Sequence, residues 1–143
     1  MPATPTGLRR ASFVVLVVAT LGNLVLVGGA ALNAPWILEH VAGGQFTTLP
    51  SGIRVLYALM FVLMLAQVWF AWLLLVRDGA WSRTSSVISI GAVVIYVLSA
   101  LVNAISPTPA ERWNAIPAVL LAASFWVLRR RRPQDRVRGG DAG

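Results

Sequence analysis

The chain has 143 residues, of which 57% are hydrophobic and 12% charged, a composition that excludes an ordinary soluble domain and is typical of an integral membrane protein. The net charge of +7 does not indicate a nucleic-acid-binding protein, because the arginines flank apolar segments and form no basic face with interleaved aromatic residues. Cysteine is absent from the sequence, which excludes disulfides, thiolate catalysis and cysteine-ligated metals.

The first apolar run follows Arg9 and Arg10 and predicts a membrane-spanning helix over residues 11–33. About 20 apolar residues cross the ~30 Å hydrocarbon core at 1.5 Å per residue. The run is longer than the apolar region of a cleaved signal peptide, so we expect an uncleaved anchor; cleavage would leave three spans. The external connection after it contains an apolar segment, 35–41, with Trp36, and we expect a short helix there, lying at the outer membrane interface.

The second and third spans are predicted over residues 53–76 and 85–106. On the third, small and polar residues recur at alternating steps of four and three, which predicts the face that packs against the other helices. This stripe comprises Ser85, Ser89, Ala92, Tyr96, Ser99, Asn103 and Ser106. The matching stripes comprise Ala19, Asn23, Leu26, Ala30 and Asn33 on the first span, Tyr57, Met60, Met64, Gln67 and Ala71 on the second, and Glu111, Ala115, Ala118, Ala122 and Phe125 on the fourth. We expect the four stripes to form the packed core.

The fourth span is predicted over residues 109–130. Thr108, Pro109 and Glu111 have the spacing of a capping box with proline at the first helical position. Pro117 leaves the carbonyl of Trp113 without its helical donor, so we expect a kink near the outer end. Residues 1–132 then form a single transmembrane domain, and 133–143 a disordered, basic, cytoplasmic tail.

The distribution of arginine predicts the orientation of these spans. Basic residues near span ends are retained on the cytoplasmic side of a membrane. Ten of the twelve arginines fall on one side of the four spans, namely Arg9, Arg10, Arg77, Arg83, Arg129, Arg130, Arg131, Arg132, Arg136 and Arg138. We therefore expect an all-α, up-down-up-down bundle of four transmembrane helices with both termini cytoplasmic. Every basic residue other than His40 is arginine, which is typical of a GC-rich bacterial genome and favours a bacterial inner membrane.

Polar and ionisable residues from all four spans and the external connection are predicted to meet at the outer surface. They are Asn33, Glu39, His40, Tyr57, Asn103, Glu111, Arg112 and Asn114. One hypothesis is an outward-facing cleft that binds a lipid headgroup or small amphiphile, with Glu111 and His40 as acid and base and Arg112 as an anion contact. The alternative is that helix ends are polar because they meet water.

Asn23 and Gln67 are the deepest polar residues and are predicted to lie at mid-membrane depth on neighbouring helices. A structural interpretation is one interhelical hydrogen bond, worth ~0.6 kcal/mol. A functional interpretation is the polar waist of a narrow pore, which would require several copies of a chain of this size.

The sequence contains no catalytic, metal-binding or cofactor-binding motif, and we expect no metal or cofactor. No ionisable side chain falls at the predicted midplane, which disfavours an ion-coupled transporter. We therefore expect a non-catalytic protein, either an accessory subunit or a binder of a lipid or small amphiphile. The alternatives are a small transporter or oligomeric pore, and a membrane-embedded enzyme that uses the outer polar cluster. The expected partners are membrane lipids and a membrane subunit or further copies of the chain, but no nucleic acid.

Overall fold

The computed structural model describes residues 6–40, 46–77, 79–106 and 109–130, with the side chains of Glu39, His40, Ala110 and Glu111 outside the description. The regular elements of these residues are all helical. They are α1 (Thr6–Ala31), the 3-10 helix η1 (Pro35–His40), α2 (Ser51–Val76), α3 (Arg83–Ala104), α4 (Pro109–Trp113) and α5 (Ala115–Leu128). Within the described ranges, α1, α2 and α3 are each long and apolar enough to cross a membrane. The prediction of an all-helical chain with long apolar helices is confirmed.

The fourth predicted span is divided in the structure. Instead of one helix over 109–130, α4 ends at Trp113 and α5 begins at Ala115, with Asn114 between them. Pro117 explains the break, because it has no N–H to donate to the Trp113 carbonyl and its ring crowds that carbonyl. The 14 residues of α5 are apolar but extend only about 21 Å at 1.5 Å per residue. The predicted cap at Thr108 and Glu111 and the predicted tail at 133–143 lie outside the described residues.

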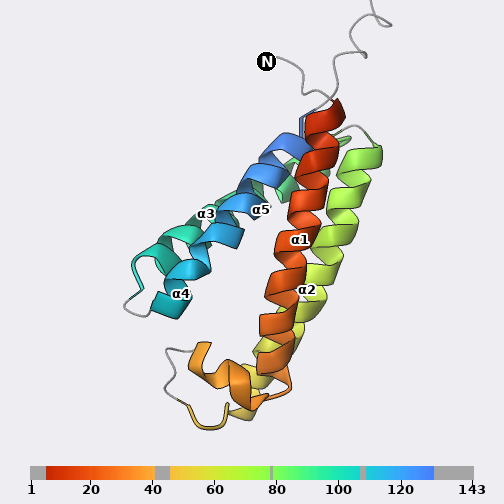
Figure 1. Ribbon diagram of the computed structural model, residues 1–143. Helices are drawn as coiled ribbons and strands as arrows, with labels where there is room; N and C mark the ends of the chain where they lie inside the picture. The colour runs from red at the N-terminus through yellow and green to blue at the C-terminus, as the bar shows by residue number, and fades with distance from the viewer. Residues whose placement is uncertain (1–5, 41–45, 78, 107–108, 131–143) are drawn as a thin grey trace, which may run out of the picture.

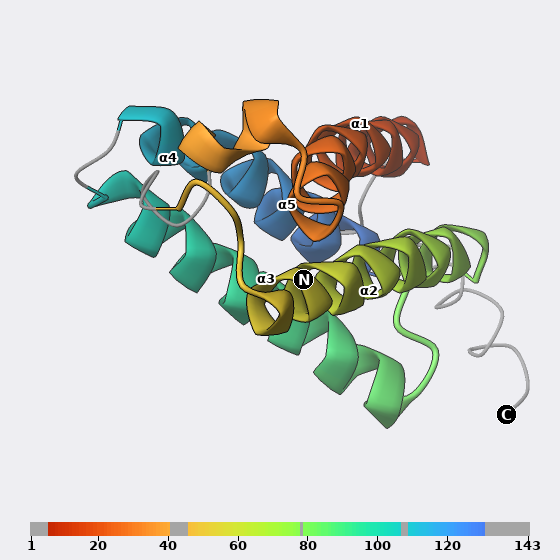
Figure 2. The same ribbon diagram turned by 90° about the horizontal axis from the view of Figure 1, so that it is seen from below.

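The helices form two hairpins that separate toward one end. Helix α1 packs along α2, α3 packs along α5, and the contact between α1 and α5 joins the two pairs. Helices α2 and α3 follow each other in the chain but make almost no contact along their lengths. Figures 1 and 2 show the resulting splayed arrangement. We call the end where α1 begins and α2 and α5 finish the closed end, and the end with η1 and α4 the open end.

Side chains fill the space between the helices in the closed half. Leu16, Leu74 and Leu128 are fully buried there, together with Phe125. The ring of Phe125 stacks on that of Tyr96 with centroids 6.2 Å apart. Close packing of this kind holds the four long elements together over about half of their length.

Arg9 is buried at the closed end and connects three helices. Its Nη2 donates a hydrogen bond of 2.7 Å to the carbonyl of Leu74 in α2, and its Nη1 donates to the carbonyl of Arg130 after α5. Both carbonyls lie at helix C-termini, where backbone acceptors lack helical donors and the helix dipole favours a cation. The predicted role of Arg9 was only to flank the first span, whereas the structure uses it as an interior clamp.

At the open end the first helix is closed by Asn33, which adopts φ 56°. The amide of Ala34 donates to the Gly29 carbonyl and that of Asn33 to the Ala30 carbonyl, the two bonds of a Schellman motif. The ring of Trp36 in η1 then packs on Gly29 so closely that a Cβ there would meet it at 2.9 Å. The expected short helix after the first span is present as η1, folded back on α1.

The predicted stripe on the third span faces inward along α3. Ser85, Ser89 and Ser106 are buried, and the intervening members are half-buried. On α2 the prediction is only partly met, because Ala71 is the one member of its stripe that is buried, whereas Met60 is 37% exposed. The reason is the divergence of α2 from α3, which leaves the stripe of α2 without a packing partner in the open half.

Candidate functional site: a cavity between the two hairpins

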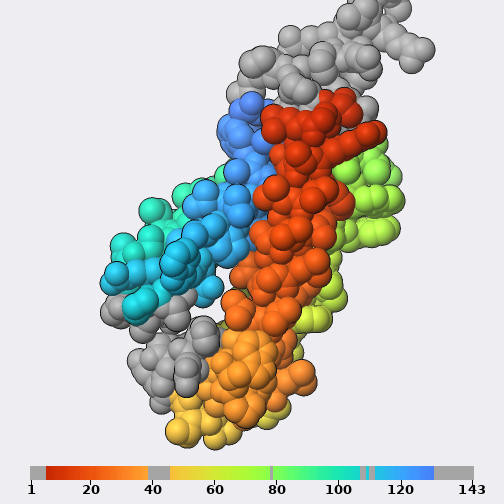
Figure 3. All heavy atoms as spheres, in the orientation of Figure 1, coloured from red at the N-terminus to blue at the C-terminus, as the bar shows by residue number. Residues whose placement is uncertain are grey.

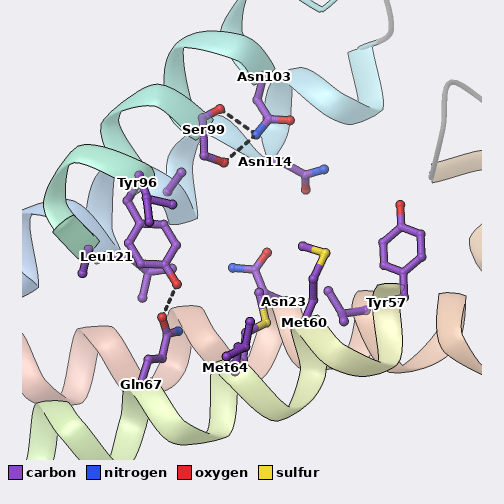
Figure 4. A pocket seen from close by; sticks show the side chains of 15 residues that line it. Asn23, Tyr57, Met60, Met64, Gln67, Tyr96, Ser99, Asn103, Asn114 and Leu121 are labelled. Atoms are coloured by element: carbon purple, nitrogen blue, oxygen red, sulfur yellow. Dashed lines mark hydrogen bonds between the residues drawn. The ribbon is translucent and has the colours of Figure 1, made fainter. Parts of the chain in front are cut away.

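A cavity of about 500 Å³ occupies the open half of the molecule, between the two hairpins. Four helices contribute to its wall, and Figure 4 shows the arrangement of the side chains. The lining residues are Asn23, Val27, Tyr57, Met60, Leu63, Met64, Gln67, Ala92, Ile95, Tyr96, Ser99, Asn103, Asn114, Ala118 and Leu121. Tyr57 and Gln67, ten positions apart on α2, mark its two ends, so it extends for about 15 Å along that helix.

The cavity opens sideways between α2 and α3. Leu63 on α2 and Ile95 on α3 line the cavity, yet they are 58% and 64% exposed, which places them at its rim. The wall on the other side is formed by α1 and α5. In Figure 3 the surfaces of these two helices meet in the upper part of the view and separate lower down. The exposure of Leu63 and Ile95 places one opening of the cavity between α2 and α3, toward the apolar outer surface.

A hydrogen-bonded polar group closes the cavity at its deep end. The Tyr96 hydroxyl donates to Oε1 of Gln67, and Nε2 of Gln67 donates to Oγ1 of the buried Thr20 at 3.1 Å. Beyond this group the packed core around Leu121 and Phe125 begins. The cavity is therefore blind toward the closed end.

The predicted mid-membrane pair, Asn23 and Gln67, lines this cavity but is not joined by a hydrogen bond. Asn23 donates from Nδ2 to the carbonyl of Ala19, one turn back on its own helix, at 3.0 Å. Gln67 bonds instead to Thr20 and Tyr96. The sequence suggested a hydrogen bond between the amides of Asn23 and Gln67. In the structure the Gln67 amide instead connects the hydroxyl groups of Thr20 and Tyr96, and so links α1, α2 and α3.

Three residues of the predicted outer polar cluster line the same cavity, namely Tyr57, Asn103 and Asn114. Nδ2 of Asn103 donates to the carbonyl of Ser99 at 2.8 Å and to its hydroxyl at 3.3 Å. The structure therefore brings the outer cluster and the mid-membrane pair, which the sequence suggested as two separate features, to the two ends of one cavity.

Two other described members of the predicted cluster, Asn33 and Arg112, form hydrogen bonds away from the cavity wall. Oδ1 of Asn33 accepts a hydrogen bond of 2.7 Å from the amide of Leu49, which holds the loop before α2 against the end of α1. Nε of Arg112 donates to the carbonyl of Ser106 at 2.7 Å, just after the end of α3. The side chains of Glu39, His40 and Glu111 lie outside the described residues.

Several lining residues were predicted to be core rather than site. Met60, Met64, Tyr96, Ser99 and Ala118 belong to the four stripes, whose spacing correctly predicts that they face the interior. Spacing along one helix contains no information about the distance to the next helix, so it could not show that this part of the interior is unfilled. Among the described residues, no group of histidine, cysteine or carboxylate side chains could hold a metal ion.

Comparison with known proteins leaves the geometry as the main guide to function. No protein-family model, no curated protein and no solved structure matches the chain.

Proposed function

We propose that this chain is a multi-pass membrane protein that binds a lipid or small amphiphile, without catalysis, in the cavity between its two hairpins. The observation that carries the proposal is the cavity itself. Its volume of about 500 Å³ lies within the range of small-molecule sites, and its wall is largely apolar with a few polar groups. Its opening faces an apolar exterior, so an amphiphile could enter it without passing through water.

The exterior of the helices supports placement in a membrane. On α2 only Ala71 and Leu74 are buried, while most of its apolar side chains, Leu59 and Trp69 among them, point outward. Soluble proteins rarely expose apolar surface of this extent. The four apolar elements are proposed to cross the bilayer, the last as α4 and α5 together.

The proposed orientation has both termini in the cytoplasm of a bacterium. Arg9, Arg77, Arg83, Arg129 and Arg130 belong to the same end of the structure, the closed end, as the positive-inside rule requires of the cytoplasmic side. The ring of Trp126 is covered by the guanidinium groups of Arg129 and Arg130, at 4.5 and 5.1 Å, as expected of a membrane interface. The cavity then lies in the outer half of the bilayer. The use of arginine as the only basic residue type besides one histidine supports a bacterial inner membrane.

Single cysteines test this orientation, since the chain has none of its own. In intact cells, Thr47→Cys should react with a membrane-impermeant maleimide, whereas Gly7→Cys should react only after the membrane is opened. Reaction of both, or of Gly7→Cys alone, would overturn the orientation.

Binding is favoured over passage because the cavity ends at Gln67 and Tyr96. The residues between this group and the closed end are packed, so a single copy offers no path across the bilayer. A transporter or pore would require several copies, and flux into proteoliposomes would reveal it.

Native mass spectrometry of the purified protein tests the binding function. Wild-type protein should retain a lipid or amphiphile from the membrane. Ala118→Phe, which fills the cavity from α5, should lose it, and Ala123→Phe, on the exposed side of the same helix, should keep it. A wild type without a retained molecule, or equal retention by the two variants, would contradict the proposal.

A further inference from the structure

The polar groups of the cavity indicate the chemistry of its ligand. Among the described lining residues none carries a carboxylate, an amine, an imidazole or a guanidinium group. The arginines nearest the open end, Arg54 and Arg112, direct Nε to backbone carbonyls of Ala31 and Ser106. A charged headgroup in this cavity would lose its hydration without gaining a counter-charge, at a cost of several kcal/mol. The site therefore suits an uncharged ligand.

Two asparagines of the wall are fixed in the same way. Asn23 and Asn103 each donate from Nδ2 to the carbonyl one turn back on their own helix, at 3.0 and 2.8 Å. The opposite amide orientation would set two oxygens against each other, so the backbone determines which atom remains. In both residues Oδ1 is left for a ligand as a hydrogen-bond acceptor, and the second N–H of the Asn23 amide also remains as a donor.

At the deep end Tyr96 provides a further acceptor, beside the second N–H of the Gln67 amide, which remains a donor. The hydroxyl hydrogen of Tyr96 is donated to Gln67, which leaves the phenolic oxygen with lone pairs only. The side chain of Asn114 makes no cap hydrogen bond at the start of α5 and can donate or accept. The wall therefore presents Oδ1 of Asn23, Oδ1 of Asn103 and the Tyr96 oxygen as acceptors along its length.

We propose that the cavity selects an uncharged amphiphile whose head carries hydrogen-bond donors, such as the hydroxyl group of a lipid alcohol. This inference rests on the proposed binding function and narrows it. The head lies against the asparagine oxygens, and the apolar part lies against Met60 and Met64 and leaves between Leu63 and Ile95. Methionine suits such a contact because its flexible thioether adapts to ligands of different shape.

Four tritiated probes with the same alkyl chain test the selection in a scintillation proximity assay on the solubilised protein. They are tetradecanol, its methyl ether, tetradecanoate and tetradecyltrimethylammonium. Tetradecanol should bind about tenfold more tightly than the ether, which cannot donate, because buried acceptors left without a partner cost at least one hydrogen bond. The two charged probes should bind more weakly than tetradecanol.

Asn103→Leu provides the matched variant. It should weaken tetradecanol about fivefold and leave the methyl ether unchanged, because only the alcohol uses the lost oxygen. Asn103→Asp keeps the acceptor and adds a negative charge, so it should improve binding of the ammonium probe. Thr84→Val on the exposed start of α3 should alter neither.

The outcomes separate the two proposals. Equal affinity for alcohol and ether, or tighter binding of a charged probe by the wild type, would overturn the donor requirement even if Asn103→Leu does not fold. The binding function would then stand if Ala118→Phe still loses its retained molecule. If the wild type binds no probe and retains no molecule, both proposals fail.

Discussion

Arginine side chains donate hydrogen bonds to carbonyls at the C-terminal ends of the helices. In each of the three long helices and after α5, an arginine from elsewhere donates to a carbonyl at or just beyond the C-terminus. The pairs are Arg9 with Leu74 and Arg130, Arg54 with Ala31, and Arg112 with Ser106. These carbonyls lack helical donors, and the C-terminal end of the helix dipole is negative. Arg54 and Arg112, the two exceptions to the one-sided charge distribution, therefore have a local structural role.

Replacing Arg9 should destabilise the protein far more than replacing its neighbour. Arg9→Met removes two hydrogen bonds from a charged donor, while the Leu74 carbonyl keeps the bond from the Gly79 amide, so the free energy of unfolding should fall by about 3 kcal/mol. Arg10→Met removes the same charge from an exposed side chain and should change it by less than about 0.5 kcal/mol. Thermal melting in detergent measures both. Equal melting temperatures would show that the clamp does not stabilise the fold.

At the scale of elements, two breaks in helical structure determine the shape of the site. Pro117 separates α4 from α5 at Asn114, which lines the cavity. The connection between α2 and α3 turns back at the closed end, where the Ala80 amide donates to the Arg129 carbonyl at 3.0 Å. This contact joins the start of α3 to the end of α5, whereas α2 packs against α1. The cavity therefore forms because contacts hold the helices together at the closed end, whereas α2 and α3 are not held together at the open end.

Gly79 is required for this connection. It adopts φ 107°, and a Cβ at this position would lie 2.8 Å from the carbonyl oxygens of Arg129 and Arg130. Because both contacts are backbone atoms and the conformation disfavours L side chains, Gly79→Ala should lower the free energy of unfolding by about 2–3 kcal/mol.

Gly91→Ala is the control for this substitution. Gly91 lies in α3 with nothing within 4 Å of its added Cβ, so alanine there should raise stability by up to about 1 kcal/mol. Chemical unfolding in mixed micelles compares the two variants. Similar stabilities for Gly79→Ala and Gly91→Ala would contradict the proposed need for glycine in the turn.

At the scale of the whole molecule, the two hairpins are tied together in one half and separate in the other. The hydrogen bond between Tyr96 and Gln67 connects α2 and α3 at the deep end of the cavity. The apolar side chains beyond this point on α2 face outward, and the gap between the helices is the proposed entrance.

Labelling of single cysteines tests this entrance. A bulky maleimide attached to Leu63→Cys, at the rim of the cavity, should slow the uptake of tetradecanol at least tenfold. The same label on Leu65→Cys, exposed on α2 but outside the cavity wall, should leave uptake unchanged. Unchanged uptake with both labels would indicate that molecules reach the cavity by another route.

The helical class, the long apolar helices and the inner face of α3 were determined by the sequence alone. Apolar runs of sufficient length specify α1, α2 and α3, and Pro117 predicts a kink in the fourth span, where the structure has a break between two helices. The stripe of serines and Tyr96 identifies the inner face of α3 because 3.6-residue periodicity is a property of a single helix. Most of the cavity wall is therefore contained in the predicted stripes.

Only the tertiary structure decided that these faces leave a cavity and that Arg9 lies in the interior. Both depend on distances between helices. Helix α1 packs along α2 and α5, and α3 packs along α5, whereas α2 and α3 meet through side chains such as Gln67 and Tyr96 without packing along each other. A stripe of small and polar residues shows which side of a helix faces inward, but the same stripe can face either a packing partner or a cavity. The separation of Gln67 from Asn23, and its bonds to Thr20 and Tyr96, likewise depend on the rotation and tilt of neighbouring helices, which no local pattern specifies.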